Sequence, residues 1–288
     1  MNLDHVYSVP HFVNPGETIS AMDLHLFAGG KGLNQSIAVA KAGGAVFHAG
    51  IVGEDGDILL DALSRQGVNI SHIRQVAGSS AHTIIQVDPS GQNSIIVYSG
   101  RNMHPSEEDM DQVLEDFGSG DLLMLQNELF GSAEMLAKAA AKGMKILFNP
   151  SPADKYIKQY PLYQVDWFIL NEIEGALITG AGEPSAILDV FSSVYPNASV
   201  VLTLGAEGAY LQNGSQRIYQ PAFPVKAVDT TAAGDTFTGY FVAGLADGIP
   251  FDRIMKRAAL AASIAVGRPG AADSIPVKQE VDDVEKQL

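Results

Sequence analysis

The strongest constraint on the fold is a regular alternation of short apolar segments with segments of helical periodicity. Continuous apolar runs predict buried strands at 46–52, 121–126, 145–148, 167–170 and 199–204. Apolar residues spaced three and four apart predict helices at 56–65, 106–117, 132–142, 172–179 and 184–194. A strand that is apolar throughout is covered on both faces, which is typical of parallel sheets with crossover helices. We therefore expect an α/β fold with a mostly parallel central sheet and helices on both faces.

One segment departs from this pattern. Residues 82–100 consist of two alternating strands joined at Asp88-Pro89-Ser90-Gly91, which predicts a hairpin. The extended, helix-poor stretch 4–27 can complete a small separate sheet with it. Such appendages often close over a binding site, so we interpret this sheet as a lid. Because no internal repeat or low-complexity linker interrupts the sequence, residues 1–288 are predicted to form one domain that carries this lid.

The charge balance argues against two classes of partner. Acidic residues number 33 and basic residues 18, and the formal net charge of −15 repels nucleic acid and anionic membranes. No apolar run reaches the length of a membrane span, about 18 residues, and the first residues lack the pattern of a signal peptide. The sequence contains no cysteine, which excludes thiol chemistry and fits a reducing compartment. We expect a cytoplasmic protein with small-molecule ligands.

The stretch AVDTTAAGDTFTGYFVAGLADG, residues 227–248, places two carboxylates around a glycine turn. It predicts a helix at 233–246, with Asp235 in the first turn. The free backbone amides from Ala232 onward and the helix dipole would form an anion site, to which Gly234 allows close approach. The alternative is structural: Asp235 complements the dipole, and a preceding threonine caps the helix.

A second motif, AGGKGLNQSIAVAKAGG at 28–44, joins glycines to polar residues at a helix start. It is not a P-loop, because Lys31 is followed by glycine rather than by Ser or Thr. It does not match the dinucleotide fingerprint either, because Gln35 stands in place of the third glycine. Lys31 and Asn34 beside glycines suit hydrogen bonding to a polyhydroxylated ligand. A tight turn that packs a helix on the sheet is the alternative.

Two further segments follow predicted strands, at the sheet edge where ligands of open α/β proteins bind. Asn171 and Glu174, in LNEIEG, come directly after a buried strand and would face its carboxyl end. The stretch 203–211 ends another strand with Gly205 and Gly208. It is either a plain turn or a bed for a nucleotide.

Taken together and in this order, GGKGLNQSIAVAKAG, LNEIE, TLGAEG, DTTAAGDTFTGYF and AVGRPGAADSIP resemble the motifs of the ribokinase-like (PfkB) carbohydrate kinases. The resemblance extends over residues 2–276. It implies the ribokinase-like fold and transfer of a phosphoryl group from ATP to a sugar hydroxyl. It also implies that Asp235 is the catalytic base. The implied anion hole consists of Ala232, Ala233 and Gly234.

The same resemblance implies binding residues for each ligand. Sugar-binding positions are matched by Asn2, Asp4, Gly30, Lys31, Gly32, Asn34, Glu128 and Asp235. Nucleotide positions are matched by Asn171, Thr203, Leu204, Gly205, Ala206, Glu207, Gly208 and Gly234. A monovalent-cation loop, expected to take K⁺, is matched by Asp229, Thr231, Ala265, Arg268, Gly270 and Ser274. Asn171 and Glu174 match the motif that organises Mg²⁺ through water. The implied cofactors are ATP, Mg²⁺ and K⁺.

The expected reaction is ATP-dependent phosphorylation of D-ribose at its primary hydroxyl, giving ribose 5-phosphate. Kinases of another sugar, a sugar acid or a nucleoside on the same scaffold are alternatives, as is a non-catalytic sugar-binding relative. Arg101 stands where the family usually has a small residue, and near the sugar it would favour an anionic substrate. The buried strand that precedes the motif at Asn2 in the family is missing from this sequence. The open edges of the lid predict a homodimer.

Overall fold

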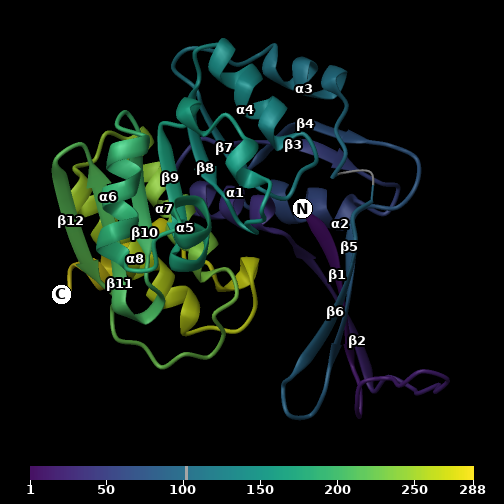
Figure 1. Ribbon diagram of the computed structural model, residues 1–288. Helices are drawn as coiled ribbons and strands as arrows, with labels where there is room; N and C mark the ends of the chain where they lie inside the picture. The colour runs from purple at the N-terminus through teal and green to yellow at the C-terminus, as the bar shows by residue number, and fades with distance from the viewer. Residues whose placement is uncertain (101–102) are drawn as a thin grey trace.

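The computed structural model describes residues 1–100 and 103–288, and a six-stranded sheet forms its centre (Figure 1). The strand order is β12-β11-β10-β9-β8-β7. Strands β7 to β10 run parallel, whereas β11 and β12 add an antiparallel edge. This arrangement confirms the predicted mostly parallel sheet. Its strands are β7 (Leu122–Gln126), β8 (Lys145–Asn149), β9 (Trp167–Asn171), β10 (Ser199–Thr203), β11 (Gly208–Asn213) and β12 (Gln216–Pro221).

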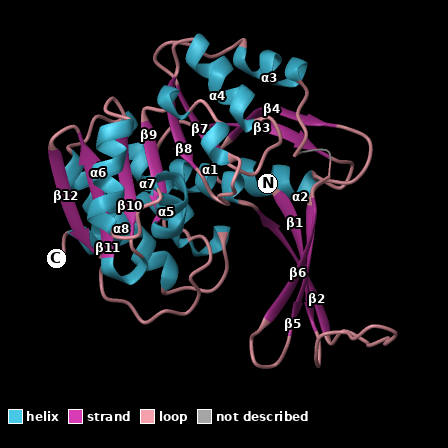
Figure 2. Cartoon of the chain, in the orientation of Figure 1, coloured by secondary structure: helices cyan, strands magenta, loops and turns pink. Residues whose placement is uncertain are grey.

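Helices cover both faces of this sheet, as predicted (Figure 2). They are α1 (Lys31–Lys41), α2 (Asp57–Ser64), α3 (Glu107–Leu114), α4 (Ser132–Ala141), α5 (Glu172–Thr179), α6 (Pro184–Val194), α7 (Ala233–Ala246), α8 (Phe251–Val266) and α9 (Lys278–Glu285). Short 3₁₀ turns lie at η1 (Ile157–Gln159), η2 (Leu162–Gln164), η3 (Gly205–Glu207) and η4 (Ala272–Ser274). Within 1–100 and 103–288, no helix combines the length and apolarity needed to cross a bilayer.

Two hydrophobic cores follow from the alternation of side chains along the central strands. Leu147 and Ile169 point to the face covered by α1, α7 and α8, where they join one core. Their neighbours Phe148, Phe168 and Leu170 point to the opposite face, where they pack with residues of α4 and α6. Because both sets are almost fully buried, the strands carry consecutive apolar residues between their ends, which is the pattern seen in the sequence.

The predicted strand at 46–52 does not join the six-stranded sheet. It forms β3 (Phe47–Val52), which pairs in parallel with β4 (Asn69–Gln75) in a separate two-stranded sheet. The side chain of Phe47 is 48% exposed, so β3 is less covered than the central strands. The continuous apolar run therefore predicted the strand correctly, but it did not predict which sheet the strand joins.

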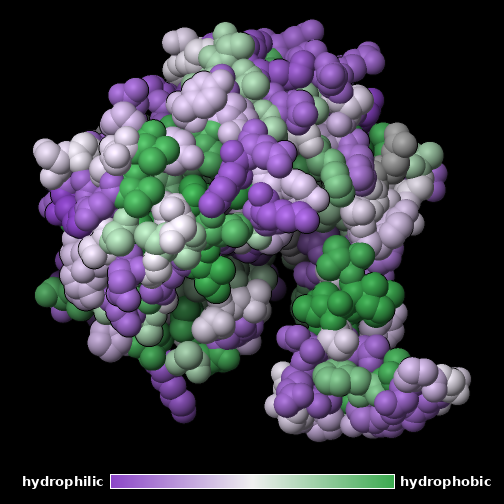
Figure 3. Space-filling view, viewed as in Figure 1, coloured by the Kyte–Doolittle hydropathy of each residue, from purple (hydrophilic) through white to green (hydrophobic). Residues whose placement is uncertain are grey.

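The predicted lid is a four-stranded sheet that projects from the rest of the molecule (Figures 1 and 3). Its order is β2-β1-β5-β6, and β1 and β5 run parallel. Both the extended N-terminal stretch and the hairpin contribute, as expected. The bounds are β1 (Asn2–Ser8), β2 (Asp23–Gly29), β5 (His82–Val87) and β6 (Asn93–Tyr98).

Helices α1 and α7 pack unusually closely, and a glycine makes this contact possible. A Cβ atom at Gly239 would lie 2.3 Å from the Cβ of Ala38 and 2.8 Å from the backbone nitrogen of Val39. No side chain fits at that point without moving α1. The backbones of the two helices therefore meet one helical turn away from Asn34 and Asp235.

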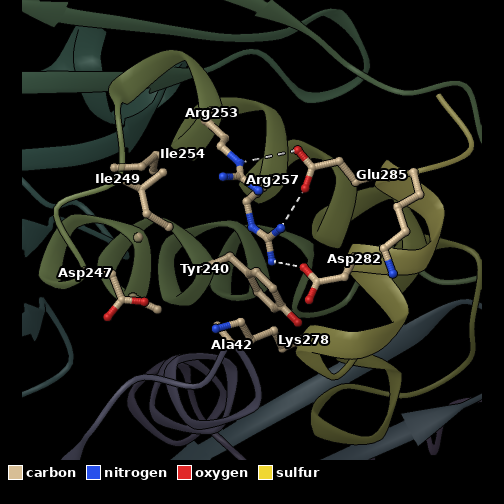
Figure 4. A pocket seen from close by; sticks show the side chains of 13 residues that line it. Ala42, Tyr240, Asp247, Ile249, Arg253, Ile254, Arg257, Lys278, Asp282 and Glu285 are labelled. Atoms are coloured by element: carbon tan, nitrogen blue, oxygen red, sulfur yellow. Dashed lines mark hydrogen bonds and ion pairs between the residues drawn. The ribbon is translucent and has the colours of Figure 1, made fainter.

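Helix α9 is held against α8 by ion pairs (Figure 4). Arg257, which is 8% exposed, contacts Asp282 at 2.6 Å and Glu285 at 2.7 Å. The hydroxyl of Tyr240 donates a hydrogen bond to the carbonyl of Pro276 at 2.9 Å, and burial raises the pKa of this phenol. Arg257 and Tyr240 therefore each have a partner within the chain, and neither leaves an uncompensated buried polar group in the groove that they line.

Candidate active site

A cavity of about 460 Å³ lies where the lid meets the helical layers and the carboxyl ends of the central strands. It is bounded by β1 of the lid, by the N-termini of α1 and α7, and by the ends of β8, β9 and β10. This is the edge at which ligands of open α/β sheets bind. Predicted site residues that line it are Asp4, Gly30, Lys31, Asn34, Glu128, Asn171, Glu174, Thr203, Thr231, Ala232, Gly234 and Asp235.

Asp235 lies in the first turn of α7 and is 8% exposed. Its carboxylate accepts two amide hydrogen bonds from consecutive residues of α1. Asn34 Nδ2 donates to Oδ2 at 3.0 Å, and Gln35 Nε2 donates to Oδ1 at 2.9 Å. The carboxylate is therefore fixed in orientation at the cavity wall, with further lone pairs free to accept a proton.

The backbone at the start of α7 has an uncommon conformation. Ala232 is the N-cap residue and has φ +61°, a left-handed value that costs a non-glycine residue about 1 kcal/mol. No side chain caps this helix, so the structural alternative in which Thr230 or Thr231 caps α7 is wrong. The amide of Ala233 donates weakly to the carbonyl of Thr230 at 3.3 Å.

The space above this helix start is open. A Cβ atom built at Gly234 would meet no other atom within 4 Å, although Gly234 lies at the cavity wall. The first amides of an α-helix have no acceptor within the helix, and they carry its positive dipole end. The structure therefore presents free donors to an open space beside Asp235, which is the geometry of an anion site.

The lid contributes Asp4 and Asn2, and each of them approaches one glycine. Asp4 Oδ1 accepts hydrogen bonds from Asn2 Nδ2, at 2.7 Å, and from the hydroxyl of Thr83. A Cβ atom at Gly29 would lie 2.1 Å from Asp4 Oδ2, and one at Gly30, where φ is +96°, would lie 2.8 Å from Asn2 Oδ1. At Gly30 the positive φ and the nearby backbone of Met1 exclude a side chain, whereas at Gly29 a side chain would displace the Asp4 carboxylate. Asn2 orients Asp4 and does not itself line the cavity.

Two further groups at this end of the cavity are suited to a polar ligand. Asn34 is 5% exposed, and its Oδ1 has no hydrogen-bond partner within the described residues. An unpaired buried acceptor is unfavourable, so a ligand hydroxyl that reached this oxygen would satisfy it. Burial raises the pKa of the Glu128 carboxyl, although the positive charge of Lys31 opposes this shift. Gly32 packs against Gln126 behind the wall.

The residues predicted to bind the nucleotide or its Mg²⁺ divide into two groups. Asn171 and Glu174 form a capping box at the start of α5. Asn171 Oδ1 accepts from the Glu174 amide at 2.9 Å, and Glu174 Oε2 accepts from the Asn171 amide at 3.0 Å. Both line the cavity together with Thr203. The remaining predicted residues, Leu204, Gly205, Ala206, Glu207 and Gly208, lie outside the wall, and their nucleotide role stays a prediction.

The predicted cation loop lies behind the anion site. Asp229 Oδ1 accepts from the Thr231 amide at 2.8 Å, and Oδ2 accepts from the Gly270 amide at 3.0 Å. Burial opposes ionisation of Asp229, but these hydrogen bonds outweigh it and lower the pKa of the carboxyl. The carbonyl of Ala265 accepts from the Arg268 amide at 3.0 Å.

Other members of this loop make contacts with neighbouring elements. The Arg268 side chain pairs with Glu280 at 2.6 Å, and the Ser274 hydroxyl donates to the carbonyl of Ala271 at 2.7 Å. No three His, Cys, Asp or Glu side chains in the described ranges gather as a metal centre. A cation site built from backbone carbonyls and the one carboxylate of Asp229 would not contain three such side chains.

Several wall residues were not predicted from the sequence: Gly29, Asn149, Ser151, Ile169, Leu170, Thr230, Thr238 and Ala271. Asn149 ends β8 just as Asn171 ends β9, so the rule applied to Asn171 could have identified it. Gln35 was considered only as a departure from a glycine motif, although it contacts Asp235. Arg101, expected near the sugar, lies outside the described residues.

Comparisons with known proteins agree with this geometry. The family model described as "pfkB family carbohydrate kinase" matches residues 1–278. The chain is 37% identical to a ribokinase of Haemophilus influenzae over 292 aligned residues, which cover 97% of this chain and 94% of that protein. The structure of this chain is similar to that of a ribokinase from Cryptococcus neoformans in complex with ADP. The TM-score is 0.87, and the two are 30% identical over 98% of this chain and 96% of the other.

A second solved structure is also similar. A ribokinase of Arabidopsis thaliana, complexed with ribose and ATP, has a TM-score of 0.86 and is 28% identical, with coverage of 99% of this chain and 96% of the other. The similarity spans the lid, the central sheet and the motifs that line the cavity. The chain belongs to the pfkB family of carbohydrate kinases.

Proposed function

We propose that this enzyme transfers the γ-phosphoryl group of ATP to the primary hydroxyl of D-ribose, giving ribose 5-phosphate and ADP. The observation that carries this proposal is the position of Asp235, whose oriented carboxylate lies beside the free first-turn amides of α7 in one cavity. Phosphoryl transfer to an alcohol requires a proton acceptor and hydrogen-bond donors that bind the transferred phosphoryl group. In this proposal residues 1–288 act as one kinase domain with a lid.

In the proposed reaction, Asp235 accepts the proton of the ribose hydroxyl as that oxygen forms a bond to the γ-phosphorus. The bond between the γ-phosphorus and the bridging oxygen breaks, and ADP leaves with that oxygen. The amides of Ala232, Ala233 and Gly234 stabilise negative charge on the migrating group. A buried carboxylate and an amide oxygen at the cavity wall, from Glu174 and Asn171, fit a hard cation held through water. Mg²⁺ there would neutralise phosphate charge when bound.

Ribose recognition is assigned to the end of the cavity beneath the lid. Asp4 can accept hydrogen bonds from sugar hydroxyls through Oδ2, and the unpaired Asn34 Oδ1 can accept another. Lys31 and Glu128 add a donor and a second carboxyl. ATP would enter from the side of Asn171 and Thr203.

The cellular location follows from the same reaction. A kinase that uses ATP as donor acts where ATP is abundant, and the cysteine-free sequence fits a reducing compartment. We therefore propose that the enzyme acts in the cytoplasm, on a small-molecule sugar.

A coupled assay of ADP release tests the substrate assignment directly. The panel contains D-ribose, 2-deoxyribose, hexoses, a sugar acid and nucleosides, each with ATP in Mg²⁺ buffer and in EDTA. We expect the highest kcat/KM for D-ribose and loss of turnover in EDTA. A higher kcat/KM for a nucleoside or a sugar acid would reassign the substrate, and ribose binding without ADP release would indicate a non-catalytic relative.

Replacing the proposed base tests the mechanism. Asp235→Asn removes the proton acceptor with little change in volume, so kcat should fall at least about a hundred-fold while ribose and ATP still bind. Calorimetric titration measures binding, and the coupled assay measures kcat. Asp247→Asn, at the exposed far end of α7, is the matched control and should retain the normal rate. Near-normal turnover in Asp235→Asn would remove Asp235 from the mechanism.

We also propose that K⁺ binds in the loop formed by Asp229 and residues 265–274 and activates the enzyme. Oxygen ligands suit a hard monovalent cation. A carbonyl oxygen that already accepts one hydrogen bond keeps a second lone pair, which can bind the cation. The loop is tied to the residues preceding the anion site through Asp229 and Thr231. An ion in this loop would therefore order the amides that hold the phosphoryl group without touching the sugar.

K⁺ should then raise kcat more than Na⁺ does, and Asp229→Ala should abolish that response while residual activity persists. The measurement is kcat in KCl, NaCl and a bulky organic chloride at matched ionic strength. Asp273→Ala, an exposed carboxylate in the same loop, should retain the response. Equal wild-type rates in KCl and in the organic salt would leave Asp229 as a purely structural tie between two loop segments.

The lid supports a further proposal, that two copies of the chain pair through this sheet. Strand register places Ile84 and Ile96 on one face, and Asp4 and Val97 on the face toward the cavity. Apolar side chains on both faces are exposed, which is unusual for a sheet that faces water (Figure 3). Covering one of these faces with a second lid would bury them and would also protect the open strand edges.

Sedimentation equilibrium should therefore give twice the chain mass of 30.5 kDa at micromolar concentration. Ile96→Lys and Val97→Lys are a matched pair, because both side chains are 61% exposed and they lie on opposite faces. The variant that sediments as a monomer identifies the face in contact. A wild-type chain that sediments at 30.5 kDa would contradict the dimer.

A further inference from the structure

Gln35 is a fully buried polar residue beside the proposed base, but it does not line the cavity. Its side chain is 1% exposed, and it extends from the first turns of α1. Its Nε2 donates to Asp235 Oδ1 at 2.9 Å, and Gln126 Nε2 donates to its Oε1 at 2.6 Å. Because Gln35 is buried and does not line the cavity, we expect no contact with a ligand bound there.

The direction of these hydrogen bonds is fixed by groups that can act in only one way. The carbonyl of Ile169 is an acceptor, so Asn149 turns its Nδ2 toward it, at 2.6 Å, and its Oδ1 toward Gln35, at 3.4 Å. Gln35 thus faces two acceptors, Asn149 Oδ1 and the carboxylate of Asp235. It must present its NH₂ group to both, and its oxygen must then face Gln126.

This chain of amides connects the base to the sheet. Gln126 ends β7, Asn149 ends β8, and Gln35 bridges them to the first turn of α7. Gln126 and Asn149 are partners at the end of the β7–β8 ladder, so both amides extend from hydrogen-bonded strands of the sheet. Asp235 lies instead in the first turn of a helix, where the backbone has fewer internal hydrogen bonds. The amides would supply the rigidity that the helix terminus lacks.

We infer that Gln35 is a positioning residue for Asp235, which holds the carboxylate in the orientation needed to accept the substrate proton, and that Gln126 orients Gln35. Asn34, which contacts the other carboxylate oxygen, differs because it also lines the cavity. Adjacent residues of one helix therefore divide two tasks. Asn34 binds ligand and base, whereas Gln35 acts through the base alone.

The inference rests on the proposed role of Asp235, and it predicts a separation of kcat from KM. Gln35→Met keeps the length of the side chain and removes its donor. Misplacement of a catalytic group by about 1 Å can lower the rate about a hundred-fold, so kcat should fall between ten- and a hundred-fold. The KM values for ribose and ATP should change less than about three-fold, because Gln35 does not contact either ligand.

The decisive measurement is the same substitution in the Asp235→Asn background. Once the base is absent, its positioning has no further effect, so the double variant should have the kcat of Asp235→Asn alone. A residue that only supports the fold would lower kcat in both backgrounds. A drop of kcat by the same factor in the double variant would therefore overturn the inference, as would a wild-type kcat in a folded Gln35→Met.

Two further variants keep the test independent of folding. Gln126→Met removes the donor to Gln35 Oε1 and should lower kcat by a smaller factor, and combining it with Gln35→Met should add nothing. Multiplied effects in that combination would contradict the chain of amides. Gln212→Met removes a buried amide on β11, far from the cavity, and should leave kcat unchanged. If Asp235→Asn itself retains full activity, the proposed mechanism fails; if only Gln35→Met does, this inference fails alone.

Discussion

The close contact between α1 and α7 is the constraint on which the candidate active site depends. The two helices approach so closely that no side chain fits at Gly239 of α7, opposite Ala38 of α1. One turn earlier on each helix, this separation brings the amides of Asn34 and Gln35 within hydrogen-bond distance of Asp235. A larger residue at 239 would move α1 outward and lengthen both hydrogen bonds. The orientation of the carboxylate is therefore set by packing some distance from the cavity.

The polar groups of the site are arranged by burial as well as by position. Asp235 and Glu174 are nearly buried, yet each accepts hydrogen bonds that stabilise its charge. Asn34 Oδ1 is the exception, since it is buried without a partner in the described chain. Ala232 adds a second unfavourable feature, because its backbone is left-handed at the start of α7, where the amides of the proposed anion site lie. Features that lower stability gather where a ligand would relieve or use them.

Much of the fold follows from local sequence patterns, because the central strands are buried on both faces and their apolar runs show this directly. The predicted strand at 167–170 matches β9, and the predicted helix at 172–179 matches α5 at both ends. Local patterns did not determine sheet membership, and β3 pairs only with β4 in the described chain. Pairing of distant strands depends on the whole topology, which periodicity does not contain.

The sequence by itself determined the order of elements, the family motifs and the position of Asp235 at a helix start. Only the tertiary structure decided what holds that carboxylate, because Gln35, which contacts it, is itself contacted by Gln126 and Asn149 from distant parts of the sequence. It also decided that the stretch after Thr203 leaves the cavity wall. A motif predicts the chemistry of its own residues, whereas hydrogen bonds between distant side chains depend on how closely the elements pack.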